Sequence, residues 1–176
     1  LPKAPLKTPV YDDIMQCIQI DLTFLPVDKG NIGILTVIDC HSKFVWAFPI
    51  QTKEAAPIAL ILFNLFSTEG YPIYLQSDNG KEFVAKCIQE LTKLMAIAQK
   101  RSRPKHPQTN GTVEVANKRI KQLLKEAQAN TESDSWTDLL PIVVAEYNNS
   151  PHSALPGISP FQRHRALVPV TGVRCT

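Results

Sequence analysis

The sequence predicts one α/β domain, built on a five-stranded mixed sheet with helices on its faces. The chain has 176 residues, which suits a single domain with a core large enough to fold unaided. Three short apolar segments with strand periodicity come first, and helical and strand patterns alternate after Ile50. Strands that are separated by helices pair in parallel, so this order predicts an antiparallel meander with parallel strands added to it.

The first three strands are predicted by alternation and by turn residues. In the first strand, Ile18, Ile20 and Leu22 alternate with polar side chains. Turn residues at 28–31 and 39–43 separate the three apolar segments. Short strands that follow one another through tight turns form an antiparallel meander. The second and third strands are expected at residues 34–38 and 44–50.

The helices are predicted by apolar spacing and by helix-breaking residues. The first helix begins at Thr52 or Glu54 and holds Pro57 in its first turn, because proline lacks the N–H group that a helix interior needs. Gly70 ends this unit, and the apolar residues between run nearly all round the helix, so we expect it to be buried. The remaining predicted elements are a strand at 73–76, a helix through 88–95, a short strand at 97–99, and helices through 113–127 and 136–147.

The ends of the chain have a different composition from its centre. Three prolines in residues 1–13 predict an extended arm, residues 14–165 form the folded core, and residues 166–176 form a tail. The segment after Tyr147 is broken by four prolines, and we assign no helix or strand to it. Because Leu1 is not an initiator methionine, we expect the chain to be a fragment, and targeting sequences can lie outside it.

Composition excludes several classes of protein. The chain is 44% hydrophobic and 20% charged, which excludes a wholly disordered or collagen-like protein. Its longest apolar stretch, 57–66, is too short to span a bilayer, so no membrane association is expected. No CxxC pair is present, which argues against a zinc site. The four cysteines are therefore interpreted as buried or incidental thiols: Cys17, Cys40, Cys87 and Cys175.

The positive charge is concentrated in one segment. Formal net charge is only +3, yet residues 100–125 hold eight of the nineteen Lys and Arg residues and one acid, Glu114. This segment therefore carries +7 and the rest of the chain −4. A concentrated basic segment on a mildly acidic body indicates a polyanionic partner.

Three acids lie where active sites of such sheets tend to form. Asp21 is in the middle of the first strand, Asp78 follows the fourth strand, and Glu114 opens a helix after a polar loop. Carboxylate oxygens with open positions beside them suit Mg²⁺. Taken singly, Asp78 is equally well explained as a turn residue and Glu114 as a helix N-terminal acid favoured by the dipole. Asp21 needs more explanation, because aspartate is poorly suited to a strand.

Three motifs decide between these interpretations. Thirty-five residues separate Asp78 from Glu114, and three short sequences surround the acids in order. The chain resembles, over about residues 16–165, the catalytic core of retroviral and LTR-retrotransposon integrases, and residues 147–152 and 157–161 look like the stretch that follows the catalytic residues in Gypsy-type integrases. The motifs are IDLT at 20–23, SDNGKEF at 77–83 and HPQTNGTVE at 106–114.

This resemblance implies a fold, a reaction and partners. The fold implied is RNase H-like, with Asp21, Asp78 and Glu114 holding two Mg²⁺ or Mn²⁺ ions. The reaction implied is phosphodiester cleavage at the 3′ end of the element's DNA, followed by attack of the freed 3′-hydroxyl on target DNA. Both steps are in-line displacements. The resemblance further implies a nuclear location and a homodimer or higher oligomer, in which the apolar helices at 57–66 and 136–147 are candidate contact surfaces.

The basic segment then becomes a candidate DNA-binding surface. Lys118, Lys121 and Lys125 share a helix face with Glu114, and Asn117 is close to it. Without the resemblance, this face is simply a solvated polar surface. Before the helix, the residues expected to contact DNA are Arg101, Arg103, Lys105, Gln108 and Asn110. The residues expected to shape the loop and the turn are Gly111, Asn79 and Gly80.

Two residues depart from the family pattern, and two alternative functions stay open. Val115 and Ala116 are small and apolar where the family usually carries an arginine or an aromatic residue. One alternative is a host-domesticated integrase core that acts as a DNA-binding or protein-interaction module with little or no catalysis. A second is an RNase H-type nuclease, which usually places an acid well inside the first helix. Residues 55–68 contain no acid.

Overall fold

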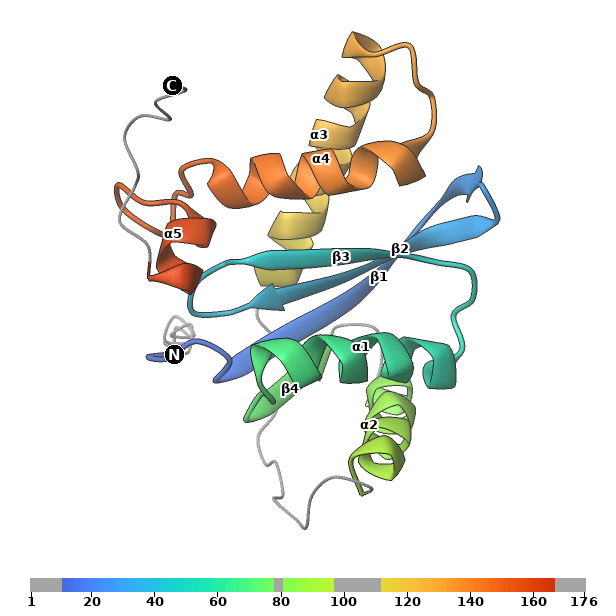
Figure 1. Cartoon of the computed structure of the whole chain (residues 1–176), viewed down its shortest axis with the longest axis vertical. Coiled ribbons are helices and arrows are strands. Elements are labelled where there is room, and N and C mark those ends of the chain that lie inside the picture. The colour runs from blue at the N-terminus through green and yellow to red at the C-terminus, as the bar shows by residue number, and fades with distance from the viewer. Residues whose placement is uncertain (1–10, 78–80, 97–111, 167–176) are drawn as a thin grey trace, which may run out of the picture.

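The structure is a computed structural model that describes residues 11–77, 81–96 and 112–166 (Figure 1). Nine helices and strands occur in these ranges. The strands are β1 (Cys17–Asp28), β2 (Asn31–Asp39), β3 (Val45–Ile50) and β4 (Tyr74–Ser77). The helices are α1 (Ala55–Glu69), α2 (Lys81–Ala96), α3 (Thr112–Asn130), α4 (Trp136–Asn149) and α5 (Pro160–Arg165).

The strands form one mixed sheet in the order β3-β2-β1-β4. The first three strands pair antiparallel and β4 pairs parallel with β1, which confirms the predicted meander with a parallel addition. The described residues contain four strands where the sequence predicts five. The expected fifth strand, residues 97–99, lies outside the described residues.

A two-residue turn sets the register of the long β1–β2 hairpin. Lys29 and Gly30 have φ angles of 50° and 79°, and Asp28 pairs with Asn31 across the turn. Positive φ at both central residues is the geometry whose twist matches that of antiparallel strands, and glycine adopts it without steric cost. The turn predicted at 28–31 is therefore confirmed, although the hairpin reaches further than the apolar alternation indicates.

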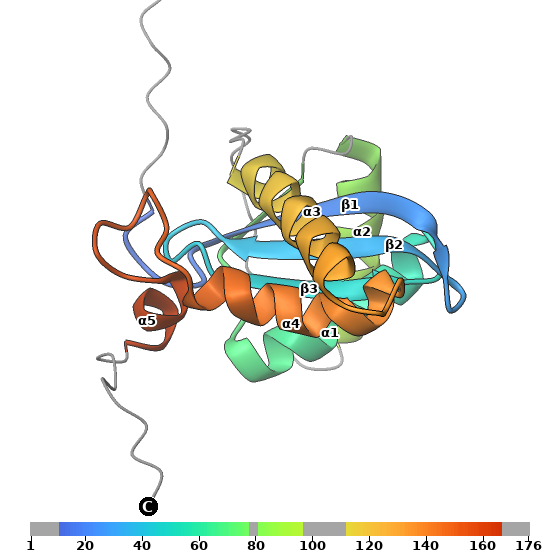
Figure 2. The same ribbon diagram turned by 90° about the horizontal axis from the view of Figure 1, so that it is seen from above.

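Helices cover both faces of the sheet (Figure 2). On one face, Ile20 of β1 and Leu35 of β2 pack in a core with α1 and α2. On the other face, Ile34 and Ile38 of β2 pack with α3 and α4. β2 is thus buried on both sides, which explains why its sequence is apolar almost throughout rather than alternating.

The first helix begins and ends close to the predicted residues. α1 has Glu54 as its N-cap and Pro57 as its third residue, where no intrahelical N–H bond is lost. Gly70 closes the helix with φ 102°, and its N–H donates to the Phe66 carbonyl at 3.0 Å. The predictions of an early proline and a terminal glycine are confirmed.

The segment after Tyr147 contains a helix that the proline count hides. In α5, Ser159 accepts a hydrogen bond from the Gln162 amide at 3.2 Å, and the Gln162 side chain accepts from the Ser159 amide at 2.9 Å. Pro160 occupies the first helical position, where proline is favoured. Assigning no element to this segment was therefore wrong, because the proline that seems to break the chain begins a helix.

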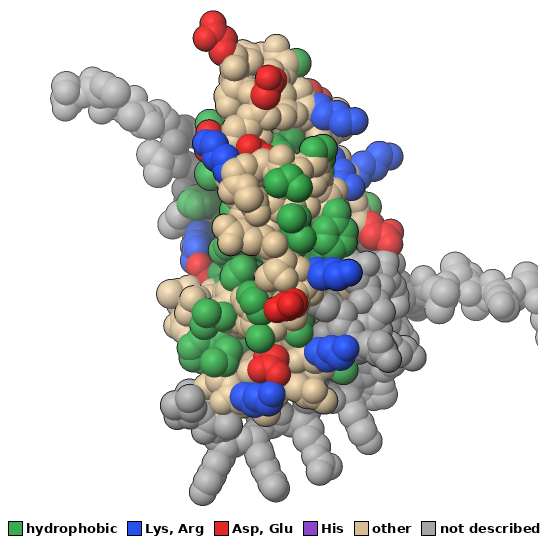
Figure 3. All heavy atoms as spheres, turned by 90° about the vertical axis from the view of Figure 1, so that its right-hand side faces the viewer, with side chains coloured by type: hydrophobic (Ala, Val, Ile, Leu, Met, Phe, Trp, Pro, Cys, Tyr) green, Lys and Arg blue, Asp and Glu red, His purple; other side chains and the backbone are tan. Residues whose placement is uncertain are grey.

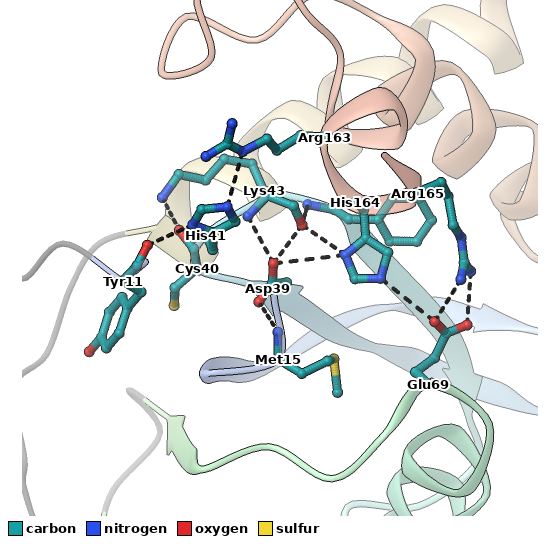
Figure 4. Close-up of polar contacts among 12 residues, drawn as sticks. Tyr11, Met15, Asp39, Cys40, His41, Lys43, Glu69, Arg163, His164 and Arg165 are labelled. Carbon is teal, nitrogen blue, oxygen red and sulfur yellow. Dashed lines mark hydrogen bonds and ion pairs between the residues drawn. The ribbon is translucent and has the colours of Figure 1, made fainter. Parts of the chain in front are cut away.

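A buried polar cluster attaches α5 to the β2–β3 turn (Figure 4). Asp39 accepts hydrogen bonds from the Ser42 amide at 2.8 Å, the Ser42 hydroxyl at 2.6 Å and the Met15 amide at 3.1 Å, as expected for an acid that caps its turn. The Ser42 hydroxyl also lies 2.9 Å from Nδ1 of His164. Every one of these side chains except that of Met15 is polar and buried, so the cluster holds α5 by satisfied hydrogen bonds as well as by packing.

Glu69 closes the other side of this cluster. Its carboxylate accepts two hydrogen bonds from the Arg165 guanidinium, at 3.0 and 2.9 Å, and lies 3.6 Å from Nε2 of His164. The His164 ring stacks on Phe44 with a centroid distance of 4.6 Å. The acid at the end of α1 therefore serves to hold α5.

The surface on the right-hand side of Figure 1 mixes side-chain types. Figure 3 shows basic, acidic and hydrophobic side chains interspersed on this face of the described residues. Within the same residues, no helix combines the length and the apolar character that crossing a membrane requires.

We expect Asp39→Asn to lower the free energy of unfolding by about 1–3 kcal/mol at pH 7, because a charged acceptor of buried hydrogen bonds is lost. Burial alone would raise the pKa of Asp39, but contacts with His164, Ser42 and Met15 outweigh it and hold the pKa below 3.8. Such a carboxylate stabilises the fold above its unfolded pKa, and this contribution disappears as the pH falls through the folded pKa. Urea unfolding at pH 7 and at about pH 2 measures both effects.

The matched control is Glu132→Gln, an exposed acid between α3 and α4. Wild type and this control should lose more stability between the two pH values than Asp39→Asn loses. An equal loss in all three proteins would contradict the stabilising role of the Asp39 carboxylate.

Candidate active site and nucleic-acid interface

Asp21 lies in the middle of β1, on the face of the sheet that α3 covers. It pairs with Thr36 of β2 and its side chain is half-buried. A carboxylate at such a position loses part of its hydration, so neighbouring groups must replace it. One of them is the side-chain amide of Asn117 in α3, which donates a hydrogen bond to Oδ2 of Asp21.

Glu114 lies in the first turn of α3, three residues before Asn117. Residues three apart on a helix are neighbours on one face, so the Asn117 bond brings Asp21 to the helix face that also carries Glu114. Glu114 is exposed, and its position near the helix N-terminus favours the charged carboxylate. Asn117 therefore links Asp21 to the beginning of the helix that carries Glu114.

Asp78, the third predicted acid, lies outside the described residues, as do the turn residues Asn79 and Gly80. The last described residue before it, Ser77, ends β4 and pairs with Ile20, which directly precedes Asp21. The chain therefore leaves the described part of β4 beside the strand position of the first acid.

A buried glutamine links the strands to α3. Oε1 of Gln19 accepts a hydrogen bond from the Val113 amide at 3.1 Å, and its Nε2 donates to Oε1 of Gln76 at 3.4 Å. Nε2 of Gln76 in turn donates to the Tyr11 hydroxyl at 3.3 Å. Gln19 is only 2% exposed and lies two residues before Asp21. The residue beside Glu114 is thus tied directly to the strand that carries Asp21.

The donor chemistry of Asp21 and Glu114 suits a hard divalent cation. Both contribute carboxylate oxygens, which Mg²⁺ and Mn²⁺ prefer, and both side chains retain exposure to solvent, so a bound ion could keep water ligands. Within residues 11–77, 81–96 and 112–166, no group of three His, Cys, Asp or Glu side chains is placed to hold a metal ion. The residues described so far supply two of the expected acids.

Three predicted DNA-contacting lysines of α3 are exposed: Lys118, Lys121 and Lys125. Their side chains lie outside the apolar face by which α3 packs on the sheet, where Ile120 and Leu124 are 2% and 3% exposed. The other residues predicted to contact DNA or shape the loop lie outside the described residues. They are Arg101, Arg103, Lys105, Gln108, Asn110 and Gly111.

The two unusual apolar residues after Glu114 have different environments. Ala116 is fully buried in the core beneath α3, whereas Val115 is 62% exposed. A large side chain at 116 would overpack this core. The small residue at 116 is therefore explained by packing, whereas nothing in the structure explains valine at 115.

Sequence reasoning missed Gln19 and the contact that Asn117 makes. Asn117 is only 7% exposed, and its amide nitrogen bonds to Asp21, although the helix spacing placed it close to the DNA-facing side. The available signal was on β1, where Gln19, Asp21 and Thr23 share one face of a strand whose other face is apolar. Polar residues on a covered face require polar partners, and α3 provides them.

Comparison with known proteins gives matches over most of the chain. A family model described as integrase core domain matches residues 14–107, and a second model of the same description matches residues 95–160. The chain is 33% identical over 146 residues to the Gag-Pol polyprotein of Walleye dermal sarcoma virus and 32% identical over 154 residues to the Pro-Pol polyprotein of Simian foamy virus type 1. These matches cover 82% and 81% of the chain but only 8% and 13% of the polyproteins.

Solved structures share the fold at low sequence identity. One is the HTLV-2 integrase catalytic core domain in complex with magnesium, in a trimeric form, with a TM-score of 0.66 and 21% identity over 85% of this chain and 96% of that one. Another is the catalytic core domain of BIV integrase, with a TM-score of 0.64 and 24% identity over 86% and 95%.

The mixed sheet with helices on both faces has the RNase H-like architecture of integrase catalytic cores. The chain belongs to the integrase core domain family.

We expect Asn117→Asp to lower the free energy of unfolding by about 1–3 kcal/mol at pH 7, because a hydrogen-bond donor to Asp21 is replaced by a second carboxylate. Two adjacent carboxylates disfavour each other's ionisation. The loss relative to wild type should therefore shrink as the pH falls towards 4 and the carboxylates protonate. Thermal unfolding of both proteins across this range measures it.

Asn130→Asp is the matched control, since it makes the same change at an exposed position of α3. Its effect and its relief at low pH should both be smaller, because only the helix dipole opposes the new charge at that exposed position. Equal behaviour of the two variants would show that Asn117 does not face Asp21 in solution.

Proposed function

We propose that this protein is an integrase-type polynucleotidyl transferase that cleaves and joins DNA strands with two Mg²⁺ or Mn²⁺ ions. The observation that supports this most directly is the attachment of Asp21 to the α3 turn that carries Glu114, through Asn117. The same two acids lie in the first and third of the motifs that resemble those of the integrase family. A surface retained only for binding would not require carboxylates at both positions.

In this proposal Asp21, Asp78 and Glu114 hold the metal ions. Ions bound there supply Lewis-acid activation of the attacking oxygen and neutralise charge at the phosphate. A water molecule first attacks a phosphodiester near the element's 3′ end, forming one P–O bond as the bond to the 3′-oxygen breaks. The leaving 3′-oxygen takes up a proton. The freed 3′-hydroxyl then attacks a target phosphodiester in the same way, and the target's own 3′-oxygen departs.

The remaining residues position the nucleic acid. Lys118, Lys121 and Lys125 extend along α3 from Glu114, and a row of exposed cations suits the phosphates of a duplex that enters the site. Phosphate contacts fix the register of the DNA without reading its sequence. Asn117 holds Asp21 in place rather than facing the DNA in this arrangement, because its amide nitrogen already donates to Asp21.

The proposed partners and location follow from the same reaction. The substrates are the DNA ends of a mobile element and a target duplex, and the proposed location is nuclear. The HTLV-2 integrase core was solved in dimeric and trimeric forms, which supports a homodimer or higher oligomer as a proposal for this chain. The alternative of a domesticated, catalytically silent core is distinguished from the enzyme by the assay below.

We expect the purified protein to convert a branched DNA that mimics an integration intermediate when Mn²⁺ is supplied. Asp21→Asn, Asp78→Asn and Glu114→Gln should each reduce this conversion to background, because each removes a charged oxygen ligand. Gel analysis of labelled strands measures the products. Circular dichroism verifies that each variant is folded.

Glu126→Gln, an exposed acid on the same helix, is the matched control and should leave conversion unchanged. A folded wild-type protein that converts no branched DNA would favour the domesticated binding module over the enzyme.

A separate prediction concerns salt. Lys118→Ala and Lys121→Ala should each weaken DNA binding for every sequence and reduce the slope of log affinity against log salt concentration by about 1, because each removes one phosphate contact. Fluorescence anisotropy with labelled duplex DNA over a range of salt concentrations measures this slope.

Lys53→Ala serves as the control, because Lys53 is an exposed lysine between β3 and α1. If it reduces the slope as much as Lys118→Ala does, binding reflects overall charge and the proposed DNA path along α3 is wrong.

A further inference from the structure

The buried side chain of Gln19 on β1 makes hydrogen bonds to two other elements beside the candidate site. A glutamine that is only 2% exposed must satisfy both ends of its amide inside the protein. Its oxygen accepts from the Val113 amide and its nitrogen donates to Gln76. One side chain therefore joins three elements: β1, β4 and α3.

These contacts lie next to the carboxylate positions. Gln19 is two residues before Asp21 and on the same face of β1. Val113 directly precedes Glu114, and Gln76 pairs with Gln19 in the parallel register that ends at Ser77. A shift of the Gln19 amide would thus be transmitted to the helix turn that carries Glu114.

The hydrogen bond from the Val113 amide to Gln19 satisfies a backbone N–H group at the start of α3. The first N–H groups of a helix have no intrahelical acceptor, so the Val113 amide needs a partner from elsewhere. A buried side chain from the sheet, that of Gln19, supplies an acceptor. The direction in which α3 begins is therefore set by β1.

We propose that Gln19 is a positioning residue of the active site, which fixes the first turn of α3, and with it Glu114, relative to Asp21 on β1. This inference rests on the proposed function for its catalytic consequence, but the positioning itself is a property of the metal-free protein. Groups that orient metal ligands typically change metal affinity or activity by about 10–100-fold when they are removed.

The test compares Gln19→Met with a matched variant, Asn148→Leu. Methionine keeps the length and apolar stem of glutamine but cannot accept the Val113 hydrogen bond or donate to Gln76. Asn148 is an equally buried amide with two hydrogen bonds, to the Val45 amide at 2.9 Å and the Val45 carbonyl at 2.8 Å, and it joins α4 to β3. Both variants lose a buried bridging amide, but only Gln19→Met loses one beside the carboxylates.

The first readout is amide hydrogen exchange at Val113 in metal-free protein, measured by NMR. Each protein is measured at the same number of degrees below its own melting temperature. Exchange of the Val113 amide should be faster in Gln19→Met than in wild type and unchanged in Asn148→Leu. The second readout is Mn²⁺ affinity by titration calorimetry, which should fall about 10–100-fold in Gln19→Met alone. Unchanged Val113 exchange in Gln19→Met, or an equal loss of Mn²⁺ affinity in both variants, would overturn the proposal.

A substitute variant and a separate criterion cover the cases in which Gln19→Met does not fold or the protein binds no Mn²⁺. If Gln19→Met does not fold, Gln76→Met removes the bonds of Gln76 with Gln19 and Tyr11 from a half-buried position while Gln19 itself is kept, and Val113 exchange should still increase. If wild type binds no Mn²⁺ and converts no branched DNA, the proposed function fails. The exchange comparison still decides whether Gln19 positions α3.

Discussion

The arrangement of this domain depends on polar groups that β1 carries on a covered face of the sheet. Gln19 and Asp21 lie on the side that α3 packs against, and a buried polar group without a partner costs free energy comparable to that of several apolar contacts. Val113 and Asn117 satisfy them from two successive turns of α3. The helix is thereby fixed in rotation as well as in position, which apolar packing alone would specify less strictly.

The two faces of the sheet consequently have different tasks. The face under α1 and α2 is packed by apolar side chains, including Ile20 and Leu35, and supplies stability without specific chemistry. The face under α3 and α4 combines an apolar core with the polar side of β1. β2 is buried on both sides and contributes side chains to both cores.

Much of the fold follows from local patterns, whereas the connections across the site do not. The β1–β2 turn, with Gly30 at positive φ, and the glycine end of α1 were predictable because the determining residues are adjacent in sequence. α5 was missed although Ser159 and Gln162 form a capping box, because counting prolines overlooked where proline is favoured. Gln19 and Val113 are 94 positions apart in the sequence, and Asp21 and Asn117 are 96 positions apart. The periodicity within each segment does not indicate which residues of the two segments pair.

The acids of this chain differ in the kind of group that holds each carboxylate. Glu69 is held by the Arg165 guanidinium and lies beside His164, and Asp39 is enclosed by Ser42, so their charges stabilise the fold. Asp21 instead accepts a hydrogen bond from the neutral amide of Asn117. An amide orients a carboxylate without neutralising its charge, whereas a guanidinium would compete with any cation that approached. The Asn117 amide therefore orients the Asp21 carboxylate from α3 without bringing a charge of its own, which suits the role of metal ligand that we propose for Asp21.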